Sequence, residues 1–102
     1  MNNHREIFQK NNKNFMVFVG GLSDLSLYTP TLTVKRRTSD TSALLSKTGV
    51  VSDPSTTYVF YLTTTDTSLN PGDYVYDVTL ESSTNRITLI KDILSILDAV
   101  KD

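Results

Sequence analysis

Few side chains in this sequence combine the type and the spacing that chemistry requires. His4 is the single histidine, so any Ser-His-Asp arrangement would need it as the base. It stands in a polar amino-terminal arm, and no pattern places a nucleophile beside it. The chain has no cysteine, which excludes a disulfide framework and a thiolate metal site. We therefore expect no catalytic residue, no cofactor and no enzymatic activity.

Nine aspartates are the remaining source of metal ligands, because calcium prefers carboxylate oxygens. Asp66, Asp73 and Asp77 come closest to a cluster, but they fall at turn and strand positions that need no metal. No loop has the D-x-[DN]-x-[DN]-G spacing of a calcium loop, and Gly20-Gly21 alone does not make a phosphate-binding loop. These patterns predict turn capping rather than a metal or nucleotide site.

The single basic run is Lys35-Arg36-Arg37, at the end of an alternating segment. Alternation puts Lys35 and Arg37 on one face, with Arg36 pointing inward or lying at the edge of a solvated edge strand. Three charges in a chain of net charge −1 do not predict nucleic-acid binding, so Lys35 and Arg37 are candidate protein contacts. No apolar run reaches the roughly 20 residues that span a bilayer, so no membrane partner is expected.

The elements that would position these residues are short strands. Ser and Thr make up about a quarter of the chain, and Thr favours strands while Ser favours turns. Turn signals recur at the roughly 8–12 residue spacing of an all-β sandwich. The predicted strands are residues 5–8, 15–19, 31–37, 43–51 with a bend at Gly49, 57–63, 74–81 and 86–90. The sequence thus predicts one all-β domain over residues 1–102, an antiparallel β-sandwich of about seven strands.

Alternation within these strands also predicts the core and the first pairing. The segments 5–8 and 15–19 flank the polar connector "QKNNKN", and we expect them to close a hairpin. The predicted core residues are Leu32, Val34, Phe60, Leu62, Tyr74, Tyr76, Val78 and Leu80.

The carboxyl-terminal segment, residues 91–102, leaves two structures open. Ile93 and Ile96 fall at helical spacing, and Asp92 could cap a short helix. Leu94 and Ile96 also fit a period of two, which predicts a closing strand after a turn at Lys91-Asp92.

Tyr74 follows a chain break at Pro71-Gly72 and begins the alternating strand 74–81. This arrangement is similar to the tyrosine corner of immunoglobulin-like sandwiches, in which the hydroxyl bonds to backbone a few residues upstream. We therefore expect a structural role for Tyr74.

The segment "FMVFV", residues 15–19, is apolar on both faces. If Phe15 and Val17 face the core, Met16 and Phe18 lie on a side that a two-layer sandwich does not cover. Met16 and Phe18 are therefore candidate protein contacts. The alternative is that the amino-terminal hairpin folds back and covers them.

The chain resembles a group of small phage virion proteins that includes the immunoglobulin-like module of upper baseplate proteins of lactococcal phages. The motifs that carry the resemblance are Asp24-Leu25-Ser26, Tyr28-Thr29, residues 31–35, residues 66–69 and residues 71–77. The family often has a glycine before its last strand, where this chain has Lys91-Asp92. Even so, the resemblance favours the strand over the helix at the carboxyl terminus.

The resemblance implies an immunoglobulin-like sandwich that docks to other virion proteins as a structural or assembly part of a tail, baseplate or head. It implies assembly in the bacterial host cytoplasm, location in the virion and a homo-oligomer, with a trimer as the expected state. The alternative function is a carbohydrate- or cell-surface-binding immunoglobulin-like module, which would need exposed aromatic side chains. The absence of tryptophan makes this alternative the weaker one.

Overall fold

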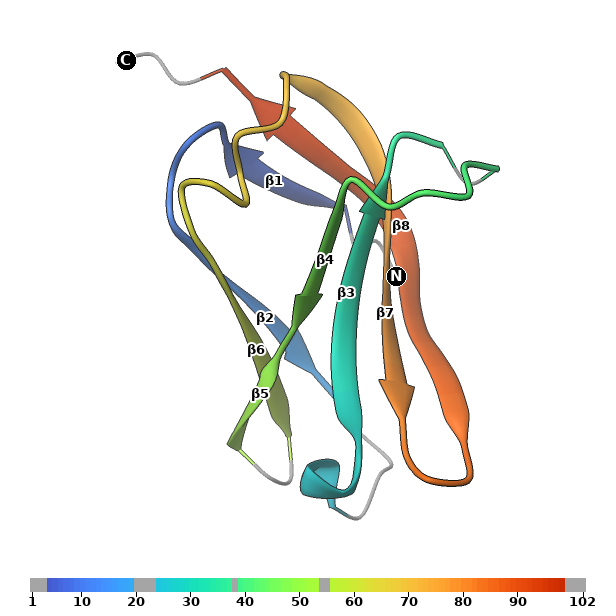
Figure 1. Ribbon diagram of the computed structural model, residues 1–102. Helices are drawn as coiled ribbons and strands as arrows, with labels where there is room; N and C mark the ends of the chain where they lie inside the picture. Colours follow the sequence, from blue (N-terminus) through green and yellow to red (C-terminus); the bar gives the residue numbers. More distant parts are fainter. Residues whose placement is uncertain (1–3, 20–23, 38, 54–55, 99–102) are drawn as a thin grey trace.

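The computed structural model describes residues 4–19, 24–37, 39–53 and 56–98 as two packed β-sheets (Figure 1). Within these ranges the strands are β1 (Arg5–Phe8), β2 (Lys13–Phe18), β3 (Thr29–Lys35), β4 (Leu45–Thr48), β5 (Val50–Asp53), β6 (Thr57–Leu62), β7 (Gly72–Glu81) and β8 (Arg86–Leu97). One turn of 3-10 helix, η1 (Leu25–Leu27), precedes β3. The predicted all-β sandwich is confirmed, with eight strands where about seven were expected.

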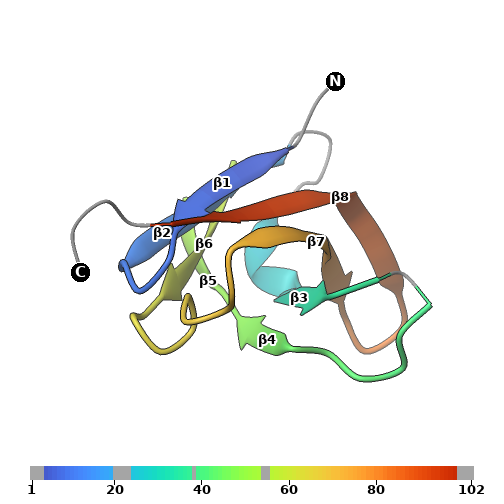
Figure 2. The same ribbon diagram turned by 90° about the horizontal axis from the view of Figure 1, so that it is seen from above.

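The strand order of the two sheets follows the immunoglobulin pattern. The five-stranded sheet has the order β1-β8-β7-β3-β4, and the three-stranded sheet has the order β2-β6-β5. The strands of an immunoglobulin sandwich are lettered along the chain. With β2 and β3 as strands B and C, and β5 to β8 as strands D to G, the order β2-β6-β5 corresponds to B-E-D and the order β8-β7-β3 to G-F-C. Figure 2 shows the sheets from above, with β1 beside β8.

The predicted hairpin between residues 5–8 and 15–19 is wrong. β1 pairs in parallel with β8, and β2 pairs antiparallel with β6 in the other sheet. The connector carries the chain from one sheet to the other, and Lys10 adopts a positive φ of 62° there. A polar connector suits a hairpin and a crossing between sheets equally well, so the pattern could not separate the two.

The carboxyl-terminal segment is a strand as far as the structure describes it, and the helix is excluded there. β8 runs without interruption from Arg86 to Leu97, so the predicted turn at Lys91-Asp92 is wrong. The irregularity lies earlier: the pairing with β7 passes from Val78↔Ile90 to Thr79↔Thr88. One extra residue in β8 forms a bulge at this point, and the shift in register disturbs the period-two pattern.

The core between the sheets contains all eight residues predicted for it, each of them buried. Its centre is Phe15, whose ring makes edge contacts with Tyr76 at 5.4 Å and with Phe60 at 6.2 Å between centroids. Tyr58 is also fully buried, and its hydroxyl donates to the Leu25 carbonyl at 2.6 Å. The aromatic contacts join β2, β6 and β7, so they connect the two sheets.

Gly49 lies where the chain leaves one sheet for the other, as the predicted bend requires. β4 belongs to the five-stranded sheet and β5 to the three-stranded sheet, with Gly49 between them. The Gly49 N–H donates to the Pro30 carbonyl at 3.0 Å. A Cβ at this position would lie 2.7 Å from a ring carbon of Phe60 and 3.0 Å from the Val59 carbonyl oxygen. The close approach of these groups requires a residue without a side chain.

Tyr74 is buried at the start of β7, and its hydroxyl donates to the Asn70 carbonyl at 2.6 Å. This is the backbone bond, four residues upstream, that a tyrosine corner makes. The Arg36 guanidinium lies 5.8 Å from the centre of the same ring. Tyr74 thus fixes the loop before β7 to the strand.

The Tyr74→Phe substitution is expected to lower the free energy of unfolding by about 1 kcal/mol, because it keeps the ring and removes this hydrogen bond. At this chain length the melting temperature should fall by roughly 4–8 °C. Differential scanning calorimetry measures the change, with Tyr61→Phe as the control because Tyr61 is exposed. Equal melting of Tyr74→Phe and the wild type would contradict the corner role.

Candidate functional site

The fold brings the single histidine to a serine and an aspartate that are distant in sequence. His4 Nε2 lies 2.6 Å from Ser95 Oγ, and Ser95 Oγ donates to Asp73 Oδ1 at 2.6 Å. Asp73 and Ser95 face each other across β7 and β8. Ser95 is buried, with 5% of its surface exposed. The sequence offered no signal for this group, because 91 residues separate His4 from Ser95.

The direction of these bonds differs from that of a catalytic triad. In a triad the serine donates its proton to the histidine, and the aspartate holds the far side of the ring. Here the one hydroxyl proton of Ser95 goes to Asp73, so His4 Nε2 supplies the proton in its own bond to Ser95. The network therefore attaches the residue before β1 to β7 and β8.

The three aspartates considered as calcium ligands lie in separate places. The Asp66 carboxylate accepts from Lys47 Nζ at 2.7 Å and from the Thr63 N–H at 2.9 Å. Burial opposes ionisation of Asp66, but these hydrogen bonds and the Lys47 charge outweigh it and lower its pKa. Asp73 accepts from Ser95, and Asp77 faces out from the middle of β7. Among the described residues, no group of three or more His, Cys, Asp or Glu side chains gathers as a metal site would require.

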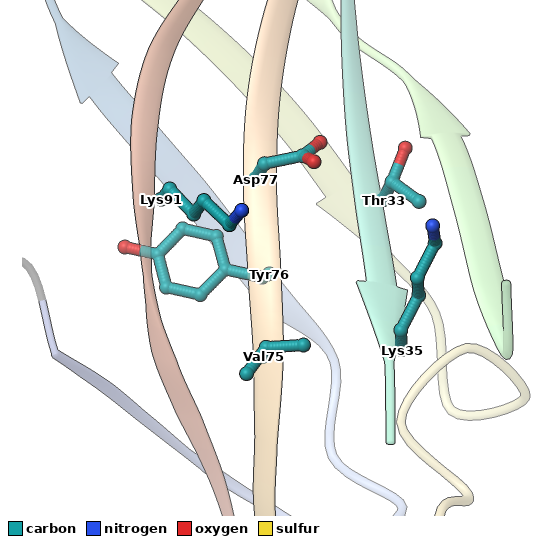
Figure 3. Close-up of a pocket in the computed structure, with 6 residues that line it drawn as sticks. All are labelled: Thr33, Lys35, Val75, Tyr76, Asp77 and Lys91. Carbon is teal, nitrogen blue, oxygen red and sulfur yellow. The ribbon is translucent and has the colours of Figure 1, made fainter. Parts of the chain in front are cut away.

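The outer face of the five-stranded sheet holds a shallow pocket of about 80 Å³ (Figure 3). Its lining residues are Thr33, Lys35, Val75, Tyr76, Asp77 and Lys91. Thr33 and Lys91 are the direct cross-strand neighbours of Asp77. With Lys35, the pocket therefore holds two cationic side chains and one anionic side chain. The volume is far below the roughly 300–1,000 Å³ of small-molecule sites. This pocket is too small and too mixed in charge to define a ligand.

The four predicted contact residues do not form one surface. Lys35 lies on the five-stranded sheet, in the pocket, and Arg37 is exposed beyond the end of β3. Met16 and Phe18 lie on the three-stranded sheet, in the opposite layer. β3 is also not an edge strand, because it pairs with β7 on one side and β4 on the other. The strand order separates the four residues and places β3 inside its sheet, and the sequence did not reveal this order.

The outer face of the three-stranded sheet carries a cluster of apolar side chains, four of which are exposed. We call this cluster the outer apolar patch, and its members are Met16, Phe18, Val50, Val59 and Tyr61. Met16 and Val50 each face Val59 directly across their strands, so these three form one row. Phe18 follows Met16 on β2, and Tyr61 follows Val59 on β6, each two residues along the same face.

The exposure of this patch is large for apolar side chains. Phe18 is 73% exposed and Tyr61 is 54% exposed, whereas the neighbouring Phe15 and Phe60 are buried in the core. Val59 is only 4% exposed, because Met16 and Val50 flank it. The alternative of an amino-terminal hairpin folded over the patch is wrong, since β1 belongs to the other sheet.

Sequence reasoning found one side of the patch and missed the other. Alternation placed Met16 and Phe18 outside, but Val59 and Tyr61 join them only through the pairing of β2 with β6, and Val50 only through the pairing of β5 with β6. The signal for Val59 and Tyr61 was present, because residues 57–63 are apolar on both faces. An apolar strand in a sandwich this thin leaves one of its faces uncovered.

Comparisons with protein-family models, curated proteins and solved structures found no match to this chain. In the part of the chain that the structure describes, no helix has the length and apolarity that crossing a bilayer requires.

Proposed function

We propose that this protein is a non-enzymatic structural or assembly part of a bacteriophage particle, and that it acts by docking its outer apolar patch against protein. The observation that carries the docking is the exposure of Phe18 and Tyr61 beside Met16 and Val50 on one sheet face. The assignment to a virion is supported by the resemblance of residues 24–35 and 66–77 to phage virion proteins. Other virion proteins or further copies of this chain are the proposed partners.

The energetic argument for a partner rests on apolar side chains gathered at one place. Isolated exposed apolar residues are ordinary on protein surfaces, but contiguous patches mark interaction sites. Fully burying one Phe, Met or Val side chain contributes roughly 1.5–3 kcal/mol. Several such side chains on one sheet face supply the central anchors that protein interfaces use.

A carbohydrate-binding module is the second candidate, because Phe18 and Tyr61 present two aromatic rings on the same face. Aromatic rings stack on sugars, but sugar sites also need polar groups that bind hydroxyls. Asn14 lies across from Tyr61 and Thr57 across from Phe18, but the row of Met16, Val59 and Val50 between the two rings is apolar. Protein docking is therefore the better supported function.

The double variant Phe18→Ser, Tyr61→Ser is expected to weaken association at least about 100-fold, because it removes two aromatic anchors that each contribute about 1.4 kcal/mol or more. Light scattering measures self-association, and calorimetric titration measures binding to the products of the neighbouring genes. The matched control is Leu44→Ser, Ile93→Ser, which removes two exposed apolar side chains outside the patch.

Retained association in the patch variant would contradict the role of the patch. A wild type that stays monomeric and binds none of the neighbouring gene products would contradict the proposed function. Binding to a glycan array that the patch variant loses would favour the carbohydrate alternative.

A further inference from the structure

The free edge of β2 lies directly beside the outer apolar patch. β2 pairs with β6 on one side, and within the described residues no strand pairs with its other side. The Val19 N–H donates to Thr56 on the β6 side, while the Met16 carbonyl accepts from Arg5 Nη2 at 2.9 Å, away from β6. Odd-numbered residues therefore bond to β6, and the N–H and C=O groups of Asn14, Met16 and Phe18 point to the free edge.

Among the described strands, this edge has the fewest of the features that usually prevent strand addition. The other edge strands, β1, β4 and β5, have four residues each. β1 carries Arg5 and Glu6, β4 carries Lys47, and β5 has an irregular register next to Asp53. β2 has six residues in unbroken register, with no charge or proline from Asn14 to Phe18. It is the longest and least protected edge that the described residues present.

The size of the adjoining face decides between a globular and an extended partner. Three strands of at most six residues cover about 14 × 20 Å, or about 300 Å² in plan. A stable interface between globular proteins buries about 800 Å² on each side. The face alone is too small for such an interface, whereas a strand that pairs with β2 adds main-chain hydrogen bonds to the apolar contact.

We infer that β2 binds an extended segment of a partner protein, which adds a fourth strand to the three-stranded sheet. The segment has apolar side chains at alternate positions, and these lie beside Met16 and Phe18 on the outer face. Its main-chain groups bond to those of Asn14, Met16 and Phe18. This inference rests on the proposed docking function and specifies how that docking occurs.

The Arg5 side chain already occupies one group on this edge, the Met16 carbonyl. Its guanidinium lies 4.7 Å from the centre of the Phe15 ring and donates to the Met16 carbonyl. An added strand would supply its own N–H to that carbonyl and release the Arg5 donor. An acidic residue on the inward side of the segment would then pair with Arg5.

A display library of random 12-residue peptides, selected on the purified chain, tests this mode of binding. We expect enriched peptides with alternating apolar residues. Binding should fall at least 30-fold in Asn14→Pro, which removes an edge N–H, and remain within twofold in Asn14→Ala, which keeps it. Met16 and Phe18 amides should also exchange at least tenfold more slowly with a selected peptide bound.

The exchange measurement uses the wild type, so the test holds even if Asn14→Pro fails to fold. No enriched peptide, equal binding by a folded Asn14→Pro variant, or new protection on β5 instead of β2 would overturn the inference. Association that is lost in Phe18→Ser, Tyr61→Ser but unchanged in Asn14→Pro would overturn strand addition alone and leave the proposed docking function intact.

Discussion

Replacing Tyr76 with alanine is expected to lower the free energy of unfolding by about 3–5 kcal/mol. The side chain is 1% exposed, and its ring packs edge-on against Phe15 between the two sheets. Its removal leaves a cavity that the strands on either side cannot close, so lost contacts add to lost burial. Chemical denaturation followed by far-UV circular dichroism measures the loss.

The matched control is Tyr76→Phe, which keeps the ring and removes only the hydroxyl. Burial raises the pKa of this hydroxyl, although the Arg5 charge opposes the shift. The hydrogen bond between this hydroxyl and Arg5 stabilises the fold less than burial of the ring does. Tyr76→Phe should therefore lower the free energy of unfolding by only about 1 kcal/mol. A Tyr76→Ala variant no less stable than Tyr76→Phe would contradict the central position of this ring.

Gly49→Ala is expected to lower the free energy of unfolding by about 2–3 kcal/mol. The added methyl group would overlap the buried ring of Phe60 and would also lie 3.0 Å from the Val59 carbonyl oxygen. Inserting a carbon into a packed core typically costs about 1–3 kcal/mol. The change is measured by the same denaturation experiment.

A double-mutant cycle with Phe60→Leu separates this overlap from the intrinsic conformational preference of glycine. On the Phe60→Leu background the smaller side chain makes room, so Gly49→Ala should cost at least about 1 kcal/mol less than in the wild type. Additive effects of the two substitutions would show that contact with Phe60 is not the reason for glycine at position 49.

The local structure could be predicted from the sequence because it depends on neighbours in the chain. Alternation in residues 31–35 and 74–81 identified the strands and the core side chains that the structure confirms. The Pro71-Gly72 break identified the position of Tyr74. Each of these depends on period two or on turn chemistry, which act over a few residues.

The pairing of distant segments could not be predicted in the same way. Nothing in residues 5–8 specifies a parallel partner in β8, and nothing near Lys91 signals that the bulge lies before it. The same limit applied to the candidate site, since no local pattern indicated that Met16 and Lys35 lie in opposite sheets. Surface residues are grouped by topology, and topology depends on packing across the whole chain.

The parallel pairing of β1 with β8 has a consequence for the order in which the molecule folds. β1 reaches its place only when the last strand is present, and the His4–Ser95 bond closes a loop across 91 residues. Loop closure over such a separation must be completed before its contacts stabilise the structure, so folding should be slow, on the order of milliseconds to seconds. A chain in which β8 has not yet formed therefore leaves Ile7 and the edge of β7 without their partners, and such exposed apolar groups and strand edges favour aggregation.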